Sequence, residues 1–431
     1  MSDFDVCVSL SEQALNSATA AIYERLHKAG KVFVGSGKVT KDGITIDVSY
    51  DISVTPCFEL NPPPAAALAD ALLTALPAQT TLSAGFAAEE TRAAAEATVA
   101  EAPTLLMKFP TIAFQFKDPE SGDKVELDTP VTLYCSLTTE AGHTTFSVLK
   151  ATAPEQPSVG AEFIVQNFLL PTVEEKADDL FRGLKIPPLD FPGVPLSAPV
   201  VAVVGGRIYA AMMLRGHGTP SIPDGGIAGL KSDFFLLAGQ RVLQASASYA
   251  IAKSPLLDKK DSKGSKAFNA HYHVKAELVH PKVAVAGSDL DVGFHFQASI
   301  DAGVHVFFVP IGIGYRGDSV PEPSAICALQ PRGTNIHVVE KSLKAFTIVV
   351  KPTGSVPTKV LSWMLEFIVQ GIVGVVTPFV TAFLKGIDFT SIKIPSIGES
   401  IEGEEFSFTP TGLRVSNVGG RIALAGKLDV G

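Results

Sequence analysis

Hydrophobic and polar residues alternate along much of the chain, and this pattern predicts long strands. Residues 44–54 alternate without a break, with Ile, Val or Tyr at the even positions and Thr, Asp or Ser at the odd ones. Residues 131–137 and 144–150 predict a hairpin, and the same alternation recurs at residues 270–278, 290–300 and 304–309. Strands with one apolar face are typical of antiparallel sheets that cover a core on one side.

Helical periodicity predicts an amphipathic helix early in each half of the chain. Residues 11–28 follow a capping box of Ser9 and Glu12. The second such helix begins after Ser232 or Asp233. The apolar positions predicted to share a helix face are Leu15, Ala18, Ile22 and Leu26 in the first helix, and Phe235, Ala238, Val242, Ala245 and Tyr249 in the second.

Three short words recur in the same order and indicate an internal repeat. EFIVQ occurs at residues 162–166 and 366–370, KIP at 185–187 and 393–395, and VGGRI at 204–208 and 418–422. Each EFIVQ word lies in a predicted second helix that Pro171 or Pro378 should kink. Each VGGR word predicts a hairpin turn.

The repeat predicts two α+β halves, residues 1–220 and 221–431, divided near residues 216–229. An Ala-rich segment at residues 62–103 is an insertion in the first half.

The order of helix, strands, second helix and strands, repeated twice, resembles the tubular lipid-binding superfamily. Its secreted two-domain members include bactericidal/permeability-increasing protein and cholesteryl ester transfer protein. The chain is similar in length to leaderless bacterial members encoded beside clostridial neurotoxin genes. The resemblance implies an elongated, pseudo-twofold pair of halves. In each half a curved antiparallel sheet wraps a pair of long helices, and an acyl chain sits between helix and sheet.

Composition narrows the classes of function. The 431-residue chain has a formal net charge of −9 and lacks a block of Lys and Arg, which argues against nucleic-acid binding. Cys7, Cys57, Cys135 and Cys327 are scattered without a CxxC pair, so free thiols are expected and no metal or other cofactor. The N-terminal residues lack the features of a secretion signal, so a cytoplasmic location is expected, with leaderless export left open.

Residues 361–384 contain one charged residue and are long enough to span a membrane. The equivalent stretch in the first half is charged at Glu174, Glu175 and Lys176, among others, which favours a core or groove helix. We therefore expect no transmembrane span, while peripheral membrane contact stays open.

Motifs for catalysis or metal binding are weak. Residues 35–38, GSGK, fail the phosphate-loop pattern and are interpreted as a hairpin turn. His271, His273, His295 and His305 could gather around a metal, but the polar residues that share a strand face with the first two favour a solvated face. No catalytic motif is recognised, so an enzyme is the least favoured of three hypotheses.

The favoured hypothesis is a non-enzymatic protein that binds a lipid or fatty-acid-like molecule in an apolar groove between helix and sheet. The alternative is an interaction or assembly protein, with a toxin as one conceivable associate and with a closed core; its protein partner is unknown. The predicted groove residues are Leu15, Ile22, Ile46, Val48, Tyr50, Phe163, Phe168, Phe235, Tyr249, Val375, Phe379 and Phe383.

Overall fold

The computed structural model describes most of the chain in seventeen stretches. These are residues 3–31, 33–41, 44–60, 104–117, 124–140, 143–156, 158–182, 193–223, 225–252, 256–265, 268–306, 309–333, 335–353, 362–385, 392–393, 397–401 and 403–431. The predicted insertion at residues 62–103 and the first KIP word lie outside the described residues, as do the last two residues of the second KIP word.

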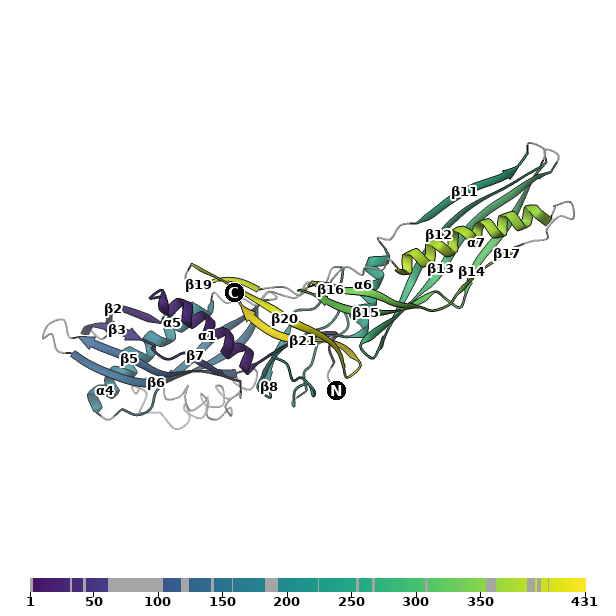
Figure 1. Ribbon diagram of the computed structural model, residues 1–431. Helices are drawn as coiled ribbons and strands as arrows, with labels where there is room; N and C mark the ends of the chain where they lie inside the picture. Colours follow the sequence, from purple (N-terminus) through teal and green to yellow (C-terminus); the bar gives the residue numbers. More distant parts are fainter. Residues whose placement is uncertain are drawn as a thin grey trace.

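The molecule is elongated, with helices and curled antiparallel sheets at its two ends and a further sheet between them (Figure 1). The strands are β1 (Val6–Ser11), β2 (Val34–Lys41), β3 (Ile44–Asp51), β4 (Cys57–Glu59), β5 (Thr104–Lys117), β6 (Lys124–Glu140), β7 (His143–Thr152), β8 (Val200–Val204), β9 (Arg207–Met212), β10 (Phe234–Ala238), β11 (Leu257–Gly264), β12 (Phe268–Ala286), β13 (Asp289–Val306), β14 (Val309–Val320), β15 (Ser324–Arg332), β16 (Asn335–Leu343), β17 (Thr347–Pro352), β18 (Ile392–Lys393), β19 (Ile397–Ile401), β20 (Glu404–Val418) and β21 (Arg421–Val430). The helices are α1 (Glu12–Lys28), α4 (Val159–Ile164), the π-helix η2 (Val165–Leu169), α5 (Leu170–Arg182), α6 (Gln240–Ile251) and α7 (Ser362–Lys385).

The central sheet joins strands from both ends of the sequence, in the order β19-β20-β21-β10-β1-β9-β8. Strands β1 and β10 pair antiparallel in its middle. The predicted VGGR turns are confirmed, because they close the hairpins β8–β9 and β20–β21. All four of their glycines have positive φ, between 58° and 78°, which a two-residue hairpin turn of this kind requires. Both chain termini lie near this sheet (Figure 1).

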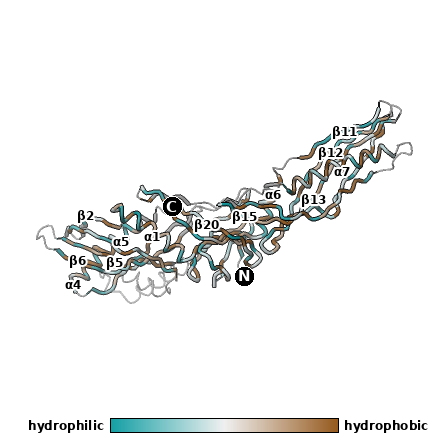
Figure 2. Tube along the Cα trace, viewed as in Figure 1, coloured by the Kyte–Doolittle hydropathy of each residue, from teal (hydrophilic) through white to brown (hydrophobic). Residues whose placement is uncertain are grey.

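The first terminal sheet has the order β2-β3-β5-β6-β7, with β4 on β5. The predicted hairpin is confirmed as β6–β7, with Glu140 opposite His143. The strand predicted at residues 44–54 is β3, which ends at Asp51. Alternation of hydrophobic and hydrophilic residues along these strands is visible in Figure 2. The apolar face of this sheet packs against α5, α1 and η2.

The second terminal sheet, here called the distal sheet, is built on the long hairpin β12–β13. The strands predicted at residues 290–300 and 304–309 are not separate, because β13 runs unbroken from Asp289 to Val306. Buried Ala302 and Val304 continue the alternation through this stretch. Gly303 keeps its place in the ladder opposite His271, whose ring occupies the space that a side chain at residue 303 would need.

The helix predicted at residues 11–28 is confirmed as α1, but its predicted cap at Ser9 and the predicted start of the second helix are wrong. The N-cap of α1 is Ser11, whose Oγ accepts a hydrogen bond from the backbone N–H of Ala14 at 3.0 Å. Ser9 instead lies in β1, where its Oγ accepts from Nε of Arg207 at 2.8 Å. The second predicted helix begins later, at Gln240, because residues 234–238 form β10 in the middle of the central sheet.

The two helices that carry EFIVQ cover 24 residues each, as α4–η2–α5 over residues 159–182 and as α7 over residues 362–385. In both, the Gln side chain of the word donates to the Glu side chain four residues earlier, at 2.9 Å and 2.8 Å. The first run contains the π-helix η2 immediately before Pro171, whereas α7 continues through Pro378. Pro378 therefore lies inside its helix without ending it.

Candidate ligand-binding site

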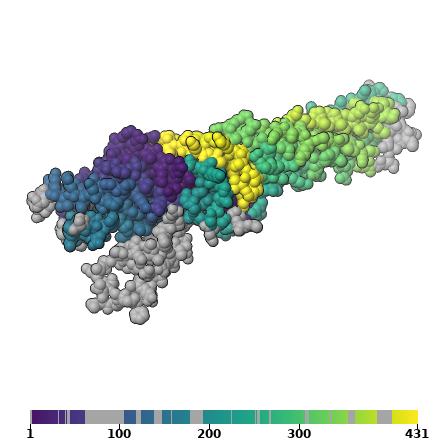
Figure 3. Space-filling view, turned by 60° about the horizontal axis from the view of Figure 1, so that its bottom comes forward, coloured from purple at the N-terminus to yellow at the C-terminus, as the bar shows by residue number. Residues whose placement is uncertain are grey.

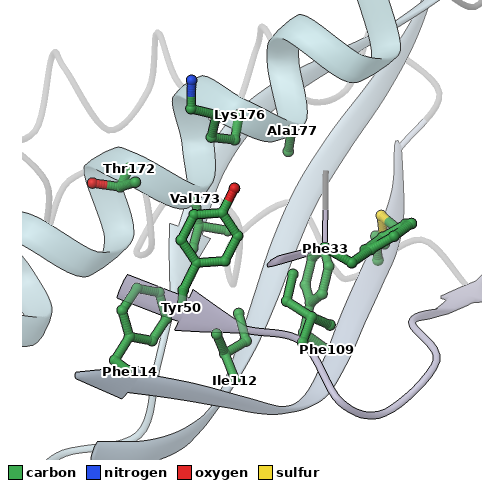
Figure 4. Close-up of a pocket in the computed structure, with 11 residues that line it drawn as sticks. Phe33, Tyr50, Phe109, Ile112, Phe114, Thr172, Val173, Lys176 and Ala177 are labelled. Carbon is green, nitrogen blue, oxygen red and sulfur yellow. The ribbon is translucent and has the colours of Figure 1, made fainter. Parts of the chain in front are cut away.

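An apolar pocket lies in the first half between α5 and the first terminal sheet. Its cavity volume is about 40 Å³, against the roughly 10–15 Å³ that one water molecule needs by such a measure. Figure 4 shows the side chains of α5 on one side and those of the strands on the other. Its lining residues are Phe33, Tyr50, Ile52, Met107, Phe109, Ile112, Phe114, Thr172, Val173, Lys176 and Ala177.

Strand β5 supplies four of the eleven lining residues, because the alternation of buried residues along this strand changes phase once. Buried residues occur at 105, 107 and 109, and then at 112, 114 and 116. The register with β6 shifts between Phe109 and Ile112, as in a β-bulge. The bulge keeps both sets on the inner face, so Phe109, Ile112 and Phe114 all face α5.

Tyr50 forms the neighbouring part of the wall. Its ring lies against Phe114 with 5.9 Å between the ring centroids. Gly35 is its partner on β2, and a Cβ at Gly35 would lie 2.6 Å from the Tyr50 ring. The glycine therefore lets this ring lie close to the sheet. In Figure 4 the Tyr50 hydroxyl points toward α5.

Phe33 is held in the pocket wall by contacts from two directions. Its carbonyl accepts a hydrogen bond from the Ile52 backbone N–H at 2.8 Å. Its ring packs edge-on against Tyr23 of α1, 5.0 Å between centroids. The Tyr23 hydroxyl donates to the Ile52 carbonyl at 2.8 Å. Helix α1 thus holds one side of the pocket in place.

The polar groups of the pocket belong mainly to α5. The Thr172 hydroxyl donates to the Phe168 carbonyl at 2.6 Å. Lys176 is exposed, and in Figure 4 its ammonium points away from the aromatic rings. Glu174 faces the sheet edge instead, where it accepts from the Ala151 N–H at 2.6 Å and lies 3.6 Å from the Lys150 ammonium. Lys176 is the only charged side chain among the eleven that line the pocket.

The predicted groove residues do not form one site. Tyr50 lines the pocket. Five others pack in the same core but do not line the pocket: Leu15, Ile22, Ile46, Val48 and Phe168. Phe163 is 50% exposed. Phe235 is buried in β10 of the central sheet, and Tyr249 lies against Gly193. Val375, Phe379 and Phe383 are half-buried on α7, in the other half of the molecule. As ligand contacts these residues stay predictions.

The sequence contained a signal for the residues that were missed. Residues 104–117 alternate in two runs separated by Pro110 and Thr111, which is typical of a strand with a bulge. Leu169, Val173 and Ala177 recur at helical spacing and indicate the buried face of α5. Only the fold, however, places that helix face opposite that strand.

The other sequence motifs take ordinary structural places. Residues 35–38 lie inside β2 opposite Tyr50, Ser49, Val48 and Asp47, so the hairpin-turn interpretation is wrong. The four candidate histidines are divided. His273 pairs with Asp258 at 2.7 Å and His295 with Glu322 at 3.2 Å, whereas the rings of His271 and His305 lie 5.7 Å apart and tilted by 53°. Among the described residues, no group of three or more His, Cys, Asp or Glu side chains could hold a metal ion.

Helix α7 is long and apolar enough to cross a membrane by length and composition, alone among the described helices. It packs along the distal sheet with a single row of residues that are 0% exposed. These are Met364, Ile368, Ile372, Val376, Val380 and Leu384. Only 28% of its most apolar stretch is buried.

Comparisons with known proteins give no family assignment. No protein-family model matches the chain, and no curated protein matches it. Among solved structures, P47 of Clostridium botulinum E1 matches with a TM-score of 0.47 and 7% identity over 99% of this chain and 100% of that one. P47 from Clostridium botulinum A2 matches with a TM-score of 0.46 and 10% identity over 98% of this chain and 97% of that one. A lipopolysaccharide binding protein matches with a TM-score of 0.33 and 10% identity over 99% of each chain. Since every TM-score is below 0.5, function is inferred from the chain's own residues.

Proposed function

We propose that the chain is a non-enzymatic protein that binds a lipid or another amphiphile in the apolar pocket between α5 and the first terminal sheet. The pocket itself carries this proposal. Apart from Tyr50 and Lys176, the eleven lining residues are all Phe, Ile, Val, Ala, Met or Thr. Pockets of this composition, with few polar groups, are typical of sites for small apolar ligands.

The volume of the pocket limits how much of a ligand it can hold in this conformation. A volume of about 40 Å³ accommodates the end of an alkyl chain rather than a whole lipid. Each methylene group that leaves water contributes about 0.8 kcal/mol to binding. Several more methylene groups must therefore be buried for micromolar affinity, which corresponds to about −8 kcal/mol.

A longer chain is accommodated when α5 moves away from the sheet. The π-helix η2 directly before α5 supports this step, because π-turns depart from regular helix geometry and occur often at functional sites. Pro171 at the second position of α5 cannot donate a backbone hydrogen bond, which further loosens the junction. The tail then extends along the inner face of β5, and Lys176 at the rim attracts a carboxylate or phosphate head group.

The apolar composition of the pocket lining supports a binding role. Its lining contains no His, Asp, Glu or Cys. The Thr172 hydroxyl donates its proton to the Phe168 carbonyl of the same helix. Binding without turnover is the function that these groups support best.

Filling the pocket tests the proposal. Ala177 is 7% exposed and faces the pocket, so Ala177→Leu should occupy the space of a ligand chain. We expect binding of a fluorescent fatty acid to fall at least tenfold, while the unfolding temperature stays the same or rises because a cavity is filled. Glu175→Leu adds the same side chain on the exposed side of α5 and should leave binding unchanged.

Equal binding by wild type and Ala177→Leu would place the ligand elsewhere. No binding of fatty acid, phospholipid or sterol by the wild type at tens of micromolar would favour the second candidate, an interaction or assembly protein. One observation supports that candidate: the row of α7 that faces the distal sheet is fully buried, as in a closed core.

We also propose that residues 1–220 and 221–431 are related halves of the tubular lipid-binding type and that the chain acts in the cytoplasm. The order of the central sheet supports the first part. It places β10 beside the hairpin β20–β21 and β1 beside the hairpin β8–β9, each with a VGGR turn. Sequence profiles built separately for the two halves should align with the three repeated words in register, and profiles that fail to align would contradict the relationship.

A further inference from the structure

The outer side of α7 is an apolar surface larger than its packing requires. Its six-residue inner row is fully buried, and Phe367 and Phe383 beside that row also reach rings of the sheet, at Tyr272 and Phe294. Seven more large apolar side chains are only half-buried beside that row: Leu365, Phe367, Val369, Val373, Val375, Phe379 and Phe383. The outermost positions, Gly374, Pro378 and Ala382, are exposed, and Trp363 is 37% exposed at the start of the helix.

This surface, here called the α7 face, carries few polar groups. Glu366 and Gln370 occupy its first part and bond to each other at 2.8 Å. From there to Lys385, the outer row contains only Gly, Pro and Ala. Atoms in the yellow-green of α7 reach the surface of the distal half in Figure 3. A helix that is apolar on its exposed side as well usually has a partner there.

Positive charges stand beside the α7 face on the edge strand β11. Lys259 and Lys263 lie opposite Val274 and Ala270 of β12, which are buried on the side of the sheet that α7 covers. Both lysines are exposed, and the ammonium of Lys263 lies 5.9 Å from the centre of the Phe367 ring. Asp261 is the one acidic residue between them on the same side.

We propose that the α7 face docks on an anionic phospholipid surface, with the helix lying in the plane of the interface. Tryptophan and lysine around an apolar helix are the residues that favour the boundary between head groups and acyl chains. Lysines that flank the helix bind lipid phosphates while their stems cover apolar surface. A second copy of the chain is a poorer occupant, because a twofold contact would bring the β11 lysines of both copies to one interface.

The helix lies on the membrane rather than across it. Its inner row is buried against the distal sheet over its whole length, from Met364 to Leu384. Spanning a bilayer would uncover that row and the sheet beneath it. The α7 face and the pocket of Figure 4 lie in different halves of the molecule, so this inference stands apart from the proposed ligand.

Trp363 provides a direct probe because it is the only tryptophan in the chain. Full-length protein is mixed with vesicles of phosphatidylcholine alone or with about a third phosphatidylglycerol. We expect a blue shift of the Trp363 emission and co-sedimentation with the anionic vesicles, both weakened by 500 mM salt. Lys259→Gln with Lys263→Gln should reduce the preference for anionic vesicles.

Charged substitutions on exposed positions locate the contact. Gly374→Asp with Ala382→Asp should lower vesicle affinity at least tenfold without loss of folding, since both positions are exposed. Ser299→Asp, on the opposite face of the distal sheet, adds an acidic residue in register with Lys275 and Arg316 and should have no effect. Ala177→Leu should leave vesicle binding intact even where it removes fatty-acid binding.

Two results would overturn the inference. One is the absence of vesicle binding, or binding that Gly374→Asp with Ala382→Asp does not change. The other is a dimer in analytical ultracentrifugation that the same double variant dissociates, without vesicle binding, which would make the α7 face a contact between copies.

Discussion

At the scale of single residues, burial decides the chemistry of the cysteine thiols. Cys7, Cys135 and Cys327 are buried and Cys57 is partly exposed, and all four are free. Burial raises the pKa of the Cys135 thiol from 9.0 to about 12, and it does the same for Cys7. The three buried thiols act as small apolar residues of the core and are poor candidates for nucleophiles or metal ligands.

The raised pKa makes stability depend on pH in a defined direction. Below pH 9 the Cys135 thiol is protonated in both the folded and unfolded chain, so it has no effect on pH dependence. Above pH 9 the unfolded chain releases the proton first, and the free energy of unfolding falls by about 1.4 kcal/mol per pH unit from this group. Stability is thus lost as pH rises from about 9 toward 12.

Cys135→Ala separates this effect from other titrations. We expect the variant to be less stable than wild type by about 1–2 kcal/mol at pH 7.5 in urea unfolding. At pH 10 the difference should shrink by about 1.4 kcal/mol, since the variant has no thiol to ionise. A difference that is the same at both pH values would show that the thiol is not buried as described.

Single residues also show where prediction from sequence ends. The glycines of GSGK were interpreted as a turn, yet Gly35 is needed where the Tyr50 ring crosses β2. The sequence predicted the cap of the first helix at Ser9, but Ser11 caps it. The Ser9 hydroxyl instead accepts a hydrogen bond from Arg207, which lies 198 residues away in sequence. Such long-range contacts have no local signal.

At the scale of elements, helix α7 combines close packing on one side with open space on the other. A Cβ on Gly371 would lie 2.5 Å from Cε1 of Tyr272, whereas one on Gly374 would meet no atom within 4 Å. Two glycines three residues apart therefore have opposite reasons to be there. The first allows the helix to approach β12, and the second lies on the α7 face.

This contrast gives a matched pair of variants. Gly371→Ala should destabilise the protein by about 1–3 kcal/mol, because the Tyr272 ring must move in a packed core. Gly374→Ala should stabilise it by about 0.4–1 kcal/mol through helix propensity and a less flexible unfolded chain. Urea unfolding of both variants checks this. Destabilisation by both would mean that the outer side of α7 is covered.

Elements with strong periodicity were predictable, and short apolar ones were not. The hairpin β6–β7 and the long strands β12 and β13 follow from alternation over many residues. Strand β10 has five consecutive buried residues, FFLLA, which fit a helix or a strand equally well by pattern. Its pairing with β1 and β21 makes it a strand, and both partners are far from it in the sequence.

At the scale of the whole molecule, the central sheet unites the two ends. Strands β1 and β10 pair in register from Val6 opposite Ala238 to Leu10 opposite Phe234. Arg207 lies over the Phe235 ring and Arg421 over the Phe4 ring, at 5.4 Å and 4.2 Å. Each arginine thus crosses from one strand group to an aromatic side chain of the other.

The repeated words predicted related halves, but they did not predict this sheet. Repeats indicate which segments are alike, whereas the pairing of β1 with β10 is a contact between the two halves that the repeated words do not contain. The pocket was missed for a similar reason: its walls come from β5 and α5, which are more than fifty residues apart in the chain. Sequence patterns identified the apolar faces, and the fold selected those that meet.

The most direct test of lipid binding is native mass spectrometry of the full chain, purified without detergent and then denatured. We predict that the wild-type protein carries an adduct of a few hundred daltons. The adduct should be released on denaturation and be identified as a fatty acid or lipid. Ala177→Leu should carry much less of it, and Glu175→Leu the same amount as wild type. A wild-type mass equal to that of the bare polypeptide, with no adduct after incubation with fatty acid or phospholipid, would contradict the account.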